Sequence, residues 1–333
     1  MKNPIDNLKI NIAFTICCNN YLAKAITLGN SIKVTNPEII FRIYLVDRLI
    51  DNILIKENIP FTIIEIETVP IPDFEGMTNR YNIVELSTSV KPFIFDHIFV
   101  NEPCIQNIIY FDPDIMLFNS CQHLFNILIT NNIILTPHLL TPSENHPYGQ
   151  PEANYLSTGI FNLGFIAVKR SEESFRFLIW WKERLTYQAF CKHEWHLFYD
   201  QKWMNLAITF FDGVYIEKNA GYNMAGWNLH ERILNKLYNV YYINEIYPLI
   251  FYHFSGVIID KLEQVSSYTK YTFENRPDLF EITNNYRLEN VKNGHNLFKD
   301  ISCAIKTHKL QITSNNITKI YRKFKEFKII FNY

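Results

Sequence analysis

Residues 108–118 read Ile-Ile-Tyr-Phe-Asp-Pro-Asp-Ile-Met-Leu-Phe, an apolar strand that ends in two carboxylates one residue apart. In extended backbone the side chains at i and i+2 point to the same side, so Asp112 and Asp114 are expected to face one point. Mg²⁺ and Mn²⁺ bind carboxylate oxygens and keep positions open for phosphate oxygens. The stretch therefore indicates a metal that holds a diphosphate at the mouth of an α/β sheet. The alternative is a solvated turn, because Asp-Pro-Asp is also good turn chemistry.

Strands and helices alternate on both sides of this stretch. Apolar runs predict strands, and helical spacing of apolar residues predicts helices, one of them interrupted early by Pro92. Strand, helix and strand in short succession favour parallel pairing and a doubly wound sheet. The expected strands cover 11–16, 41–47, 61–66, 133–138 and 159–168, and the expected helices cover 22–34, 87–100 and 171–184. A long proline-rich loop is expected over 141–154.

The composition is that of a folded domain rather than a nucleic-acid-binding or membrane-spanning chain. The 333 residues are 48% hydrophobic and carry a net charge of −1. We expect one large core, with or without a small appendage, and no general nucleic-acid binding. No apolar run is long enough to cross a bilayer, and the first residues lack the apolar core of a signal peptide, which predicts a cytoplasmic protein. The six cysteines show no metal-binding spacing and are expected to be buried thiols.

The C-terminal part differs from the rest, because the alternation of strands and helices fades after about residue 266. We expect a catalytic domain over 1–260 and a mainly helical extension over 261–333. Residues 315–333 place basic side chains among large apolar ones, as in an amphipathic helix on an anionic membrane surface. Packing of this helix on the domain is the alternative. The basic residues are Lys319, Arg322, Lys323, Lys325 and Lys328.

In this order the pieces resemble the GT-A glycosyltransferases, in particular glycosyltransferase family 8 and related bacterial enzymes, over about residues 10–256. The resemblance implies a Rossmann-like mixed sheet flanked by helices, with a nucleotide-sugar half over about 1–118 and an acceptor half over about 119–260. Two departures are a missing Lys-Pro-Trp after Gly256 and a missing acidic residue before Asn20. The matching motifs are Asn20-Tyr21, Tyr110–Asp114, Phe161–Gly164, Asp200-Gln201 with Asn205, and His253–Gly256.

The resemblance also implies roles for individual residues. It makes His253 a third ligand beside Asp112 and Asp114 for Mn²⁺ or Mg²⁺, and places Asp200 and Gln201 beside the anomeric carbon as catalytic residues. The alternatives are a core histidine bonded to backbone at 253 and a helix cap at 200. Expected donor contacts are Thr15, Asn20, Tyr21, Asp47, Lys91, which would replace the missing phosphate-binding lysine, Asn162 and Gly164. For Tyr21 an ordinary core position, and for Asp47 a cap of the following segment, are the alternatives.

The expected reaction is metal-dependent transfer of a sugar from a nucleotide diphosphate, most commonly UDP, to a glycan, lipid-linked or protein acceptor, with retention. Residues 222–227 and His138 are candidates for sugar contacts, and the loop over 141–151 for closure over the donor. An inverting enzyme with Asp200 as general base and a non-catalytic nucleotide-sugar-binding protein are the alternatives. A sugar-nucleotide pyrophosphorylase is disfavoured, because no glycine-rich phosphate loop occurs early in the chain. The segment 315–333 would bring the enzyme to the inner face of the cytoplasmic membrane.

Overall fold

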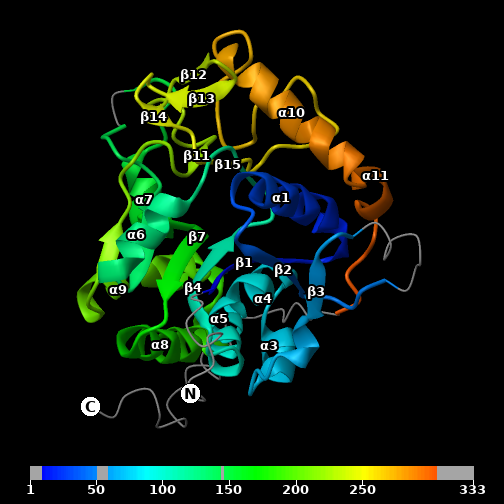
Figure 1. Cartoon of the computed structure of the whole chain (residues 1–333), viewed down its shortest axis with the longest axis vertical. Coiled ribbons are helices and arrows are strands. Elements are labelled where there is room, and N and C mark those ends of the chain that lie inside the picture. The colour runs from blue at the N-terminus through cyan, green and yellow to red at the C-terminus, as the bar shows by residue number, and fades with distance from the viewer. Residues whose placement is uncertain (1–9, 51–58, 144–145, 306–333) are drawn as a thin grey trace, which may run out of the picture.

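A seven-stranded sheet forms the centre of the computed structural model, which describes residues 10–50, 59–143 and 146–305 (Figure 1). The strand order is β10-β6-β7-β4-β1-β2-β3. Strand β7 runs antiparallel to β4 and β6, and the other strands share one direction. The expected mixed α/β sheet is thus confirmed. The bounds are β1 Ile10–Cys17, β2 Ile40–Leu45, β3 Thr62–Glu65, β4 Ile105–Phe111, β6 Ile133–Pro137, β7 Phe161–Lys169 and β10 Val214–Ile216.

Helices cover both faces of this sheet. Helices α1 (Leu22–Thr35) and α6 (Gln122–Thr130) pack on one face. Helices α4 (Ile83–Ser89), α5 (Lys91–Asn101), α8 (Glu172–Gln188) and α9 (Met204–Phe210) pack on the other, and α3 (Phe74–Arg80) adjoins them. Successive residues of β1 therefore alternate between two apolar layers, which explains why this strand is apolar nearly throughout.

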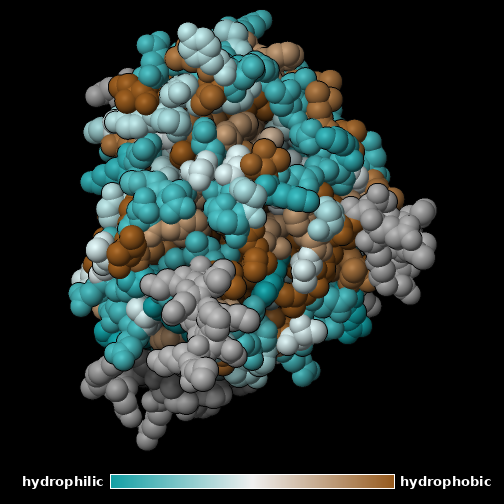
Figure 2. Space-filling model, viewed as in Figure 1, coloured by the Kyte–Doolittle hydropathy of each residue, from teal (hydrophilic) through white to brown (hydrophobic). Residues whose placement is uncertain are grey.

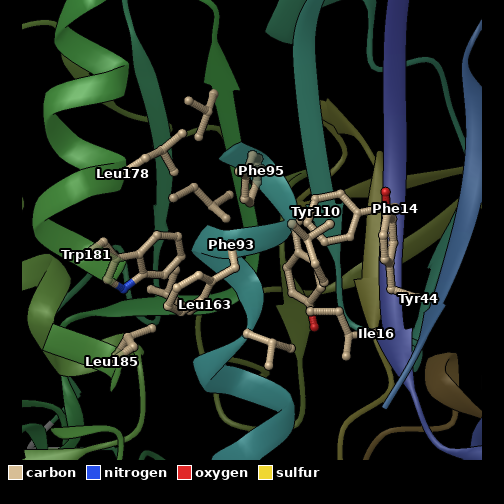
Figure 3. Packing of buried hydrophobic residues seen from close by; sticks show 14 of the residues in the cluster. Phe14, Ile16, Tyr44, Phe93, Phe95, Tyr110, Leu163, Leu178, Trp181 and Leu185 are labelled. Atoms are coloured by element: carbon tan, nitrogen blue, oxygen red, sulfur yellow. The ribbon is translucent and has the colours of Figure 1, made fainter. Parts of the chain in front are cut away.

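Aromatic rings fill the layer between the sheet and helices α5 and α8 (Figure 3). The ring of Phe14 lies 5.5 Å from that of Tyr44 and 4.9 Å from that of Phe95. Trp181 of α8 follows at 6.5 Å from Phe95. Full burial of such a side chain contributes about 1.5–3 kcal/mol, so this layer stabilises the packing of α5 and α8 on the sheet.

The helix expected over 87–100 is in fact two helices with a break at Val90. Asn82 begins α4 with a capping box: its side chain accepts the Glu85 N–H, and the Glu85 carboxylate accepts the Asn82 N–H. Pro92 lies in the first turn of α5, where its missing N–H costs nothing. The break places Lys91 at the start of α5, facing the end of β7.

A second, three-stranded sheet carries the chain from the stretch at 108–118 to the C-terminal half. It is formed by β5 (Ile115–Leu117), β11 (Met224–Ala225) and β15 (Phe251–His253), and His253 pairs with Ile115. The smaller strands are β8 Cys191–Lys192, β9 Leu197–Phe198, β12 Leu234–Leu237, β13 Val240–Ile243 and β14 Tyr247–Pro248. The end of the loop expected over 141–154 is helical, because α7 (Glu152–Thr158) begins directly after Pro151.

The described part of the predicted extension packs on the N-terminal half. Helices α10 (Asp278–Lys292) and α11 (His295–Phe298) run beside α1 (Figure 1). The side chain of Asn293 donates to the hydroxyl of Thr27 at 2.9 Å, and the ring of Tyr286 stacks on Phe254 at 3.9 Å. The basic segment 315–333 lies outside the described residues, so its predicted helix stays a prediction.

Figure 2 shows polar and apolar residues interspersed over the visible face. Among residues 10–50, 59–143 and 146–305, no helix combines the length and the apolar character needed to cross a bilayer.

Candidate metal and donor site

Polar side chains collect at the carboxyl edge of the central sheet. Because β1, β2, β4 and β6 share one direction, the residues that follow them meet at one edge. These are Asn19, Asp47, Asp112 and His138, and Asn162 joins them because β7 starts at the same edge. The fold thus brings positions as far apart in sequence as 19 and 162 to the same edge of the sheet.

Asp112 and Asp114 converge through a turn and not through the extended backbone that we expected. The Ile115 N–H donates to the Asp112 carbonyl at 3.1 Å, which closes a turn around Pro113. The Phe254 N–H donates to the Asp114 carbonyl at 2.8 Å and ties this turn to β15. Turn geometry and convergence of the two carboxylates, which seemed alternatives, therefore occur together.

His253 completes the cluster that we call the acidic triad, formed by Asp112, Asp114 and His253. Its Nε2 atom lies 3.0 Å from an Asp114 oxygen and 3.6 Å from an Asp112 oxygen. One donor atom from each residue lies within 4.8 Å of the other two. Two carboxylates and an imidazole form a donor set suited to Mn²⁺ or Mg²⁺.

A chain of hydrogen bonds sets the tautomer of His253. The side-chain oxygen of Asn162, Oδ1, lies 3.1 Å from Nδ1 of His253 and can only accept a hydrogen bond, so Nδ1 carries the proton. The Asn162 amide nitrogen lies 3.4 Å from Nε2 of His138, whose Nδ1 lies 3.3 Å from the Ile160 carbonyl. In neutral His253 the Nε2 lone pair therefore faces the carboxylates, as metal ligation requires. The alternative of a core histidine bonded to backbone does not describe these contacts.

Gly164 is needed where the backbone of β7 meets this chain. A Cβ atom at this position would collide with Cε1 of His253 and would lie 2.9 Å from Oδ1 of Asn162. The Gly164 carbonyl accepts the Asp112 N–H at 2.7 Å. The glycine thus permits the close approach expected from the sequence.

Charges within the triad shift its pKa values in opposite directions. Burial raises the pKa of Asp114, but the facing imidazolium of His253 outweighs it, and the pKa falls to about 2. Burial lowers the pKa of His253, but Asp114 and Asp112 outweigh it and the net shift is upward. The Asp112 and Asp114 side chains remain 32% and 15% exposed. A cation from solvent can therefore reach the triad and replace the proton.

Asp200 forms a second charged cluster with Lys91, which we call the buried pair. Their charged atoms lie 2.5 Å apart, and the two side chains are 3% and 1% exposed. Lys91 also donates to the Leu163 carbonyl at 2.8 Å and lies 4.2 Å from the centre of the Tyr110 ring. Burial raises the pKa of Asp200 and the charge of Lys91 opposes this shift. Asp200 lies at the N-cap position of the short helix Gln201–Trp203, but its side chain makes no capping bond there.

Gln201 and Tyr110 extend these two clusters. The side-chain oxygen of Gln201, Oε1, accepts the Leu163 N–H at 3.3 Å. The side-chain amide nitrogen of Gln201, Nε2, donates to the Thr158 carbonyl at 3.0 Å. The Tyr110 hydroxyl donates to Asp112 at 2.5 Å, while its ring faces Lys91. Tyr110 thereby connects the acidic triad to the buried pair, a role that its strand position did not reveal.

The expected nucleotide contacts differ in exposure. Thr15 and Asp47 are fully buried, whereas Tyr21 is 42% exposed and Asn20 is also exposed. Asp47 accepts N–H groups from Asn19, Arg48 and Ala304. Its contacts are those of the capping alternative, whereas the Tyr21 ring is open to a base. Donor contact by these residues stays a prediction.

Lys24 is a candidate residue that sequence reasoning missed. Its ammonium lies 4.4 Å from the centre of the Tyr21 ring. Its positive charge adds to the downward shift of the Asp114 pKa and opposes the upward shift of the His253 pKa. The spacing of three residues from Tyr21 in a helix could have indicated this shared side.

Trp227 belongs to the wall of the triad. Its ring lies 5.3 Å from that of His253 and 5.5 Å from that of His138. The ring of Tyr155, a residue of α7, lies 4.9 Å from that of His138. The Trp227 indole N–H and the Tyr155 hydroxyl are buried without a hydrogen-bond partner in the described chain. From the loop over 141–151, Tyr148 stacks on Tyr271 at 4.5 Å.

Comparison with known sequences gives distant relatives. No family model matches the chain. It is 25% identical over 199 residues to the uncharacterized protein YfnD of Bacillus subtilis (strain 168), covering 59% of this chain and 61% of YfnD. It is 24% identical over 192 residues to the uncharacterized protein YfnF of the same organism, covering 56% and 62%. The chain thus spans about three-fifths of these relatives' length.

Several solved structures that are similar to this fold are glycosyltransferases. The galactosyltransferase LgtC, solved in complex with donor and acceptor sugar analogs, has 17% identity and a TM-score of 0.46, covering 65% of this chain and 76% of LgtC. The glycosyltransferase GlyE of Streptococcus pneumoniae TIGR4 has 16% identity and a TM-score of 0.47, covering 86% and 63%. Donor, acceptor and metal are therefore inferred from the residues of the site alone.

Proposed function

We propose that this chain is a metal-dependent glycosyltransferase of the GT-A type that uses a nucleotide-diphosphate sugar. The convergence of Asp112, Asp114 and Nε2 of His253 at the carboxyl edge of the sheet carries this proposal. A divalent ion bound there acts as a Lewis acid on the departing diphosphate. The motif order that resembles family 8 also supports this proposal.

The donor would lie along the edge of the sheet between β1 and the triad. The exposed ring of Tyr21 offers a stacking surface for a base, and Asn20 offers an amide beside it. Lys24 supplies positive charge between this ring and the triad, where a diphosphate would lie. Lys24 would thus serve in place of the lysine missing after Gly256, since Lys91 is occupied by Asp200. UDP is the proposed nucleotide, by resemblance alone.

Asp200 and Gln201 would flank the reacting sugar carbon. Lys91 holds Asp200 in one orientation, and two backbone groups hold the side chain of Gln201. A preorganised carboxylate and amide stabilise positive charge that develops at the anomeric carbon. Retention is proposed from the resemblance to family 8 alone. Inversion with Asp200 as base remains the competing proposal, and the configuration of the product separates the two.

The acceptor would approach from the side of Trp227 and Tyr155, whose polar groups have no partner in the described chain. A glycan, lipid-linked or protein acceptor satisfies this proposal.

Contact of residues 315–333 with the inner membrane face is a separate part of the proposed function. Full-length protein should sediment with anionic liposomes at low salt and be released at high salt. A chain that ends at Thr313 should stay in solution, and equal sedimentation of both would exclude the contact.

A donor panel tests the function directly. Full-length protein is incubated with nucleotide sugars and Mn²⁺, and released nucleotide and the anomeric configuration of the sugar are followed by nuclear magnetic resonance. We expect turnover of one donor class, loss of turnover with chelator, and no turnover by Asp114→Asn. Metal-dependent UDP binding without any turnover would favour the non-catalytic alternative. Absence of both would refute the proposal.

A further inference from the structure

Two cysteines that are 285 positions apart, by subtraction of 18 from 303, meet at the carboxyl ends of β1 and β2. The Sγ atoms of Cys18 and Cys303 lie within 4.8 Å of each other. Both face the same acceptor, the Val46 carbonyl, at 3.2 Å and 3.5 Å. We propose that Cys18 and Cys303 are a redox modification site, at which a small disulfide oxidant converts the two thiols into one intramolecular disulfide.

Asp47 holds the two cysteines in place from below. Its oxygens accept the Asn19 N–H at 3.3 Å and the Ala304 N–H at 2.7 Å, which are the amides next to Cys18 and Cys303 in sequence. The Asn19 side chain and the Arg48 N–H also donate to this carboxylate, at 2.7 Å and 2.8 Å. With four N–H groups bound, Asp47 has no lone pair left for a metal. The cluster is therefore a positioned dithiol and not a three-ligand metal site.

The chemistry divides between the two thiols by their exposure. Cys303 is partly exposed, whereas Cys18 is 9% exposed. A hydrogen bond from Cys18 lowers the pKa of Cys303, and the pKa of Cys18 is raised. The Cys303 thiolate attacks a sulfur of glutathione disulfide and releases one glutathione. Cys18 then displaces the second glutathione from Cys303. Two protein thiols and one small disulfide thus become one protein disulfide and two small thiols.

The bond would anchor the end of the described chain to the sheet. Phe298 and Ile301 already pack in the apolar layer of α1, and Cys303 and Ile305 pack against the layer of Cys18. The cross-link would tie residues 301–305 beside the turn that contains Asn20 and Tyr21. The position of this turn beside the nucleotide rests on the proposed function. Oxidation therefore decides whether this segment can leave that edge.

Peptide mapping of the full-length protein tests the bond without any donor. The protein is treated with glutathione disulfide, alkylated and digested with trypsin without reduction. We expect peptide 10–24 to be linked to peptide 300–306 and reduced wild type to lack this link. Because peptide 10–24 also contains Cys17, Cys17→Ala is the matched control: Cys17 faces the opposite apolar layer, and the link should persist. Cys18→Ser and Cys303→Ser should each abolish it.

Two further readouts address anchoring. Hydrogen exchange of the Ala304 amide should slow at least tenfold on oxidation of wild type, and the melting temperature should rise by about 5 °C, because the closed loop is long. Neither change should occur in Cys18→Ser. Glutathione retained on Cys303 with Cys18 still free, or a link to another cysteine, would overturn the proposal. Unchanged exchange at Ala304 in cross-linked protein would overturn the anchoring. Failure of sugar transfer would leave the peptide map unaffected.

Discussion

The acidic triad and the buried pair lie at the same edge of the sheet, and each sets carboxylate against a nitrogen base. In the triad the Asp112 and Asp114 side chains are 32% and 15% exposed. In the buried pair Asp200 and Lys91 are 3% and 1% exposed. An accessible carboxylate can exchange its partner for a cation from solvent, whereas a sealed one keeps its partner and its orientation. Similar chemistry therefore supports ligand capture in one cluster and positioning in the other.

The buried pair should show the largest effect on stability. Lys91→Met leaves the Asp200 charge buried without a partner, so we expect the free energy of unfolding to fall by about 3–5 kcal/mol. The double variant Lys91→Met/Asp200→Asn removes that charge and should recover part of the loss. Urea denaturation measures both. A double variant no more stable than Lys91→Met would contradict the description of the pair as a sealed charge pair.

The triad should show a large effect on binding with little on folding. Asp112→Asn and Asp114→Asn each remove a charged ligand, so we expect Mn²⁺-dependent UDP affinity to fall about 100-fold, which corresponds to about 2.7 kcal/mol. Calorimetric titration of UDP with and without Mn²⁺ measures this change. Asp212→Asn, an exposed carboxylate beyond α9, is the control and should bind as wild type. Equal affinity in all variants would show that the triad is not the metal site.

Positioning in the buried cluster should appear in rate and not in affinity. Asp200→Asn and Gln201→Ala should lower kcat about tenfold to 100-fold while the donor dissociation constant stays within about threefold, because both act on the developing charge. Single-turnover kinetics and donor titration separate the two quantities. A loss of thermal stability with unchanged turnover per folded molecule would assign both residues a structural role.

Substitution of Lys24 should weaken binding of the nucleotide diphosphate at the triad. Lys24→Met removes a charge next to the triad, so we expect UDP to bind about tenfold more weakly in Mn²⁺ while uridine binding is unchanged. Because this lysine repels a cation at the triad, affinity for Mn²⁺ alone should stay the same or rise. Lys33→Met, at the far end of α1, is the matched control. Unchanged UDP affinity would remove Lys24 from the site.

Changes in pH should act on both stability and metal affinity through the triad. The raised pKa of His253 contributes stability to metal-free protein that is present below the unfolded pKa and is lost as pH rises through the folded pKa. The lowered pKa of Asp114, about 2, contributes stability that is lost as pH falls from its ordinary value of 3.8. Mn²⁺ must displace the His253 proton, so its affinity should rise up to tenfold per pH unit below the His253 pKa. Titrations between pH 5.5 and 8 check this, and the slope should flatten in His253→Gln.

Periodicity in the sequence was enough for much of the sheet and for placing Asp112 and Asp114 directly after β4. The alternation of apolar runs placed β1, β2, β4 and β7 nearly correctly, because buried strands must be apolar on both faces. It left the turn at Pro113 as an alternative and placed the interruption of the helix over 87–100 at Pro92, whereas the break lies at Val90, since local hydrogen bonds decided both. His253 was inferred only from resemblance, because nothing in its own strand distinguishes a ligand from a core histidine.

What only the tertiary structure decided is which distant side chains meet and which of them solvent can reach. Lys91 was expected at a phosphate, yet the fold seals it against Asp200 and leaves Lys24 beside the triad. Cys18 and Cys303 showed no spacing signal, because their contact depends on packing of α11 against the short helix Asn19–Tyr21 that follows β1. Composition and periodicity report on burial of neighbours along the chain, whereas ligand geometry depends on contacts between elements whose relative placement no local pattern encodes.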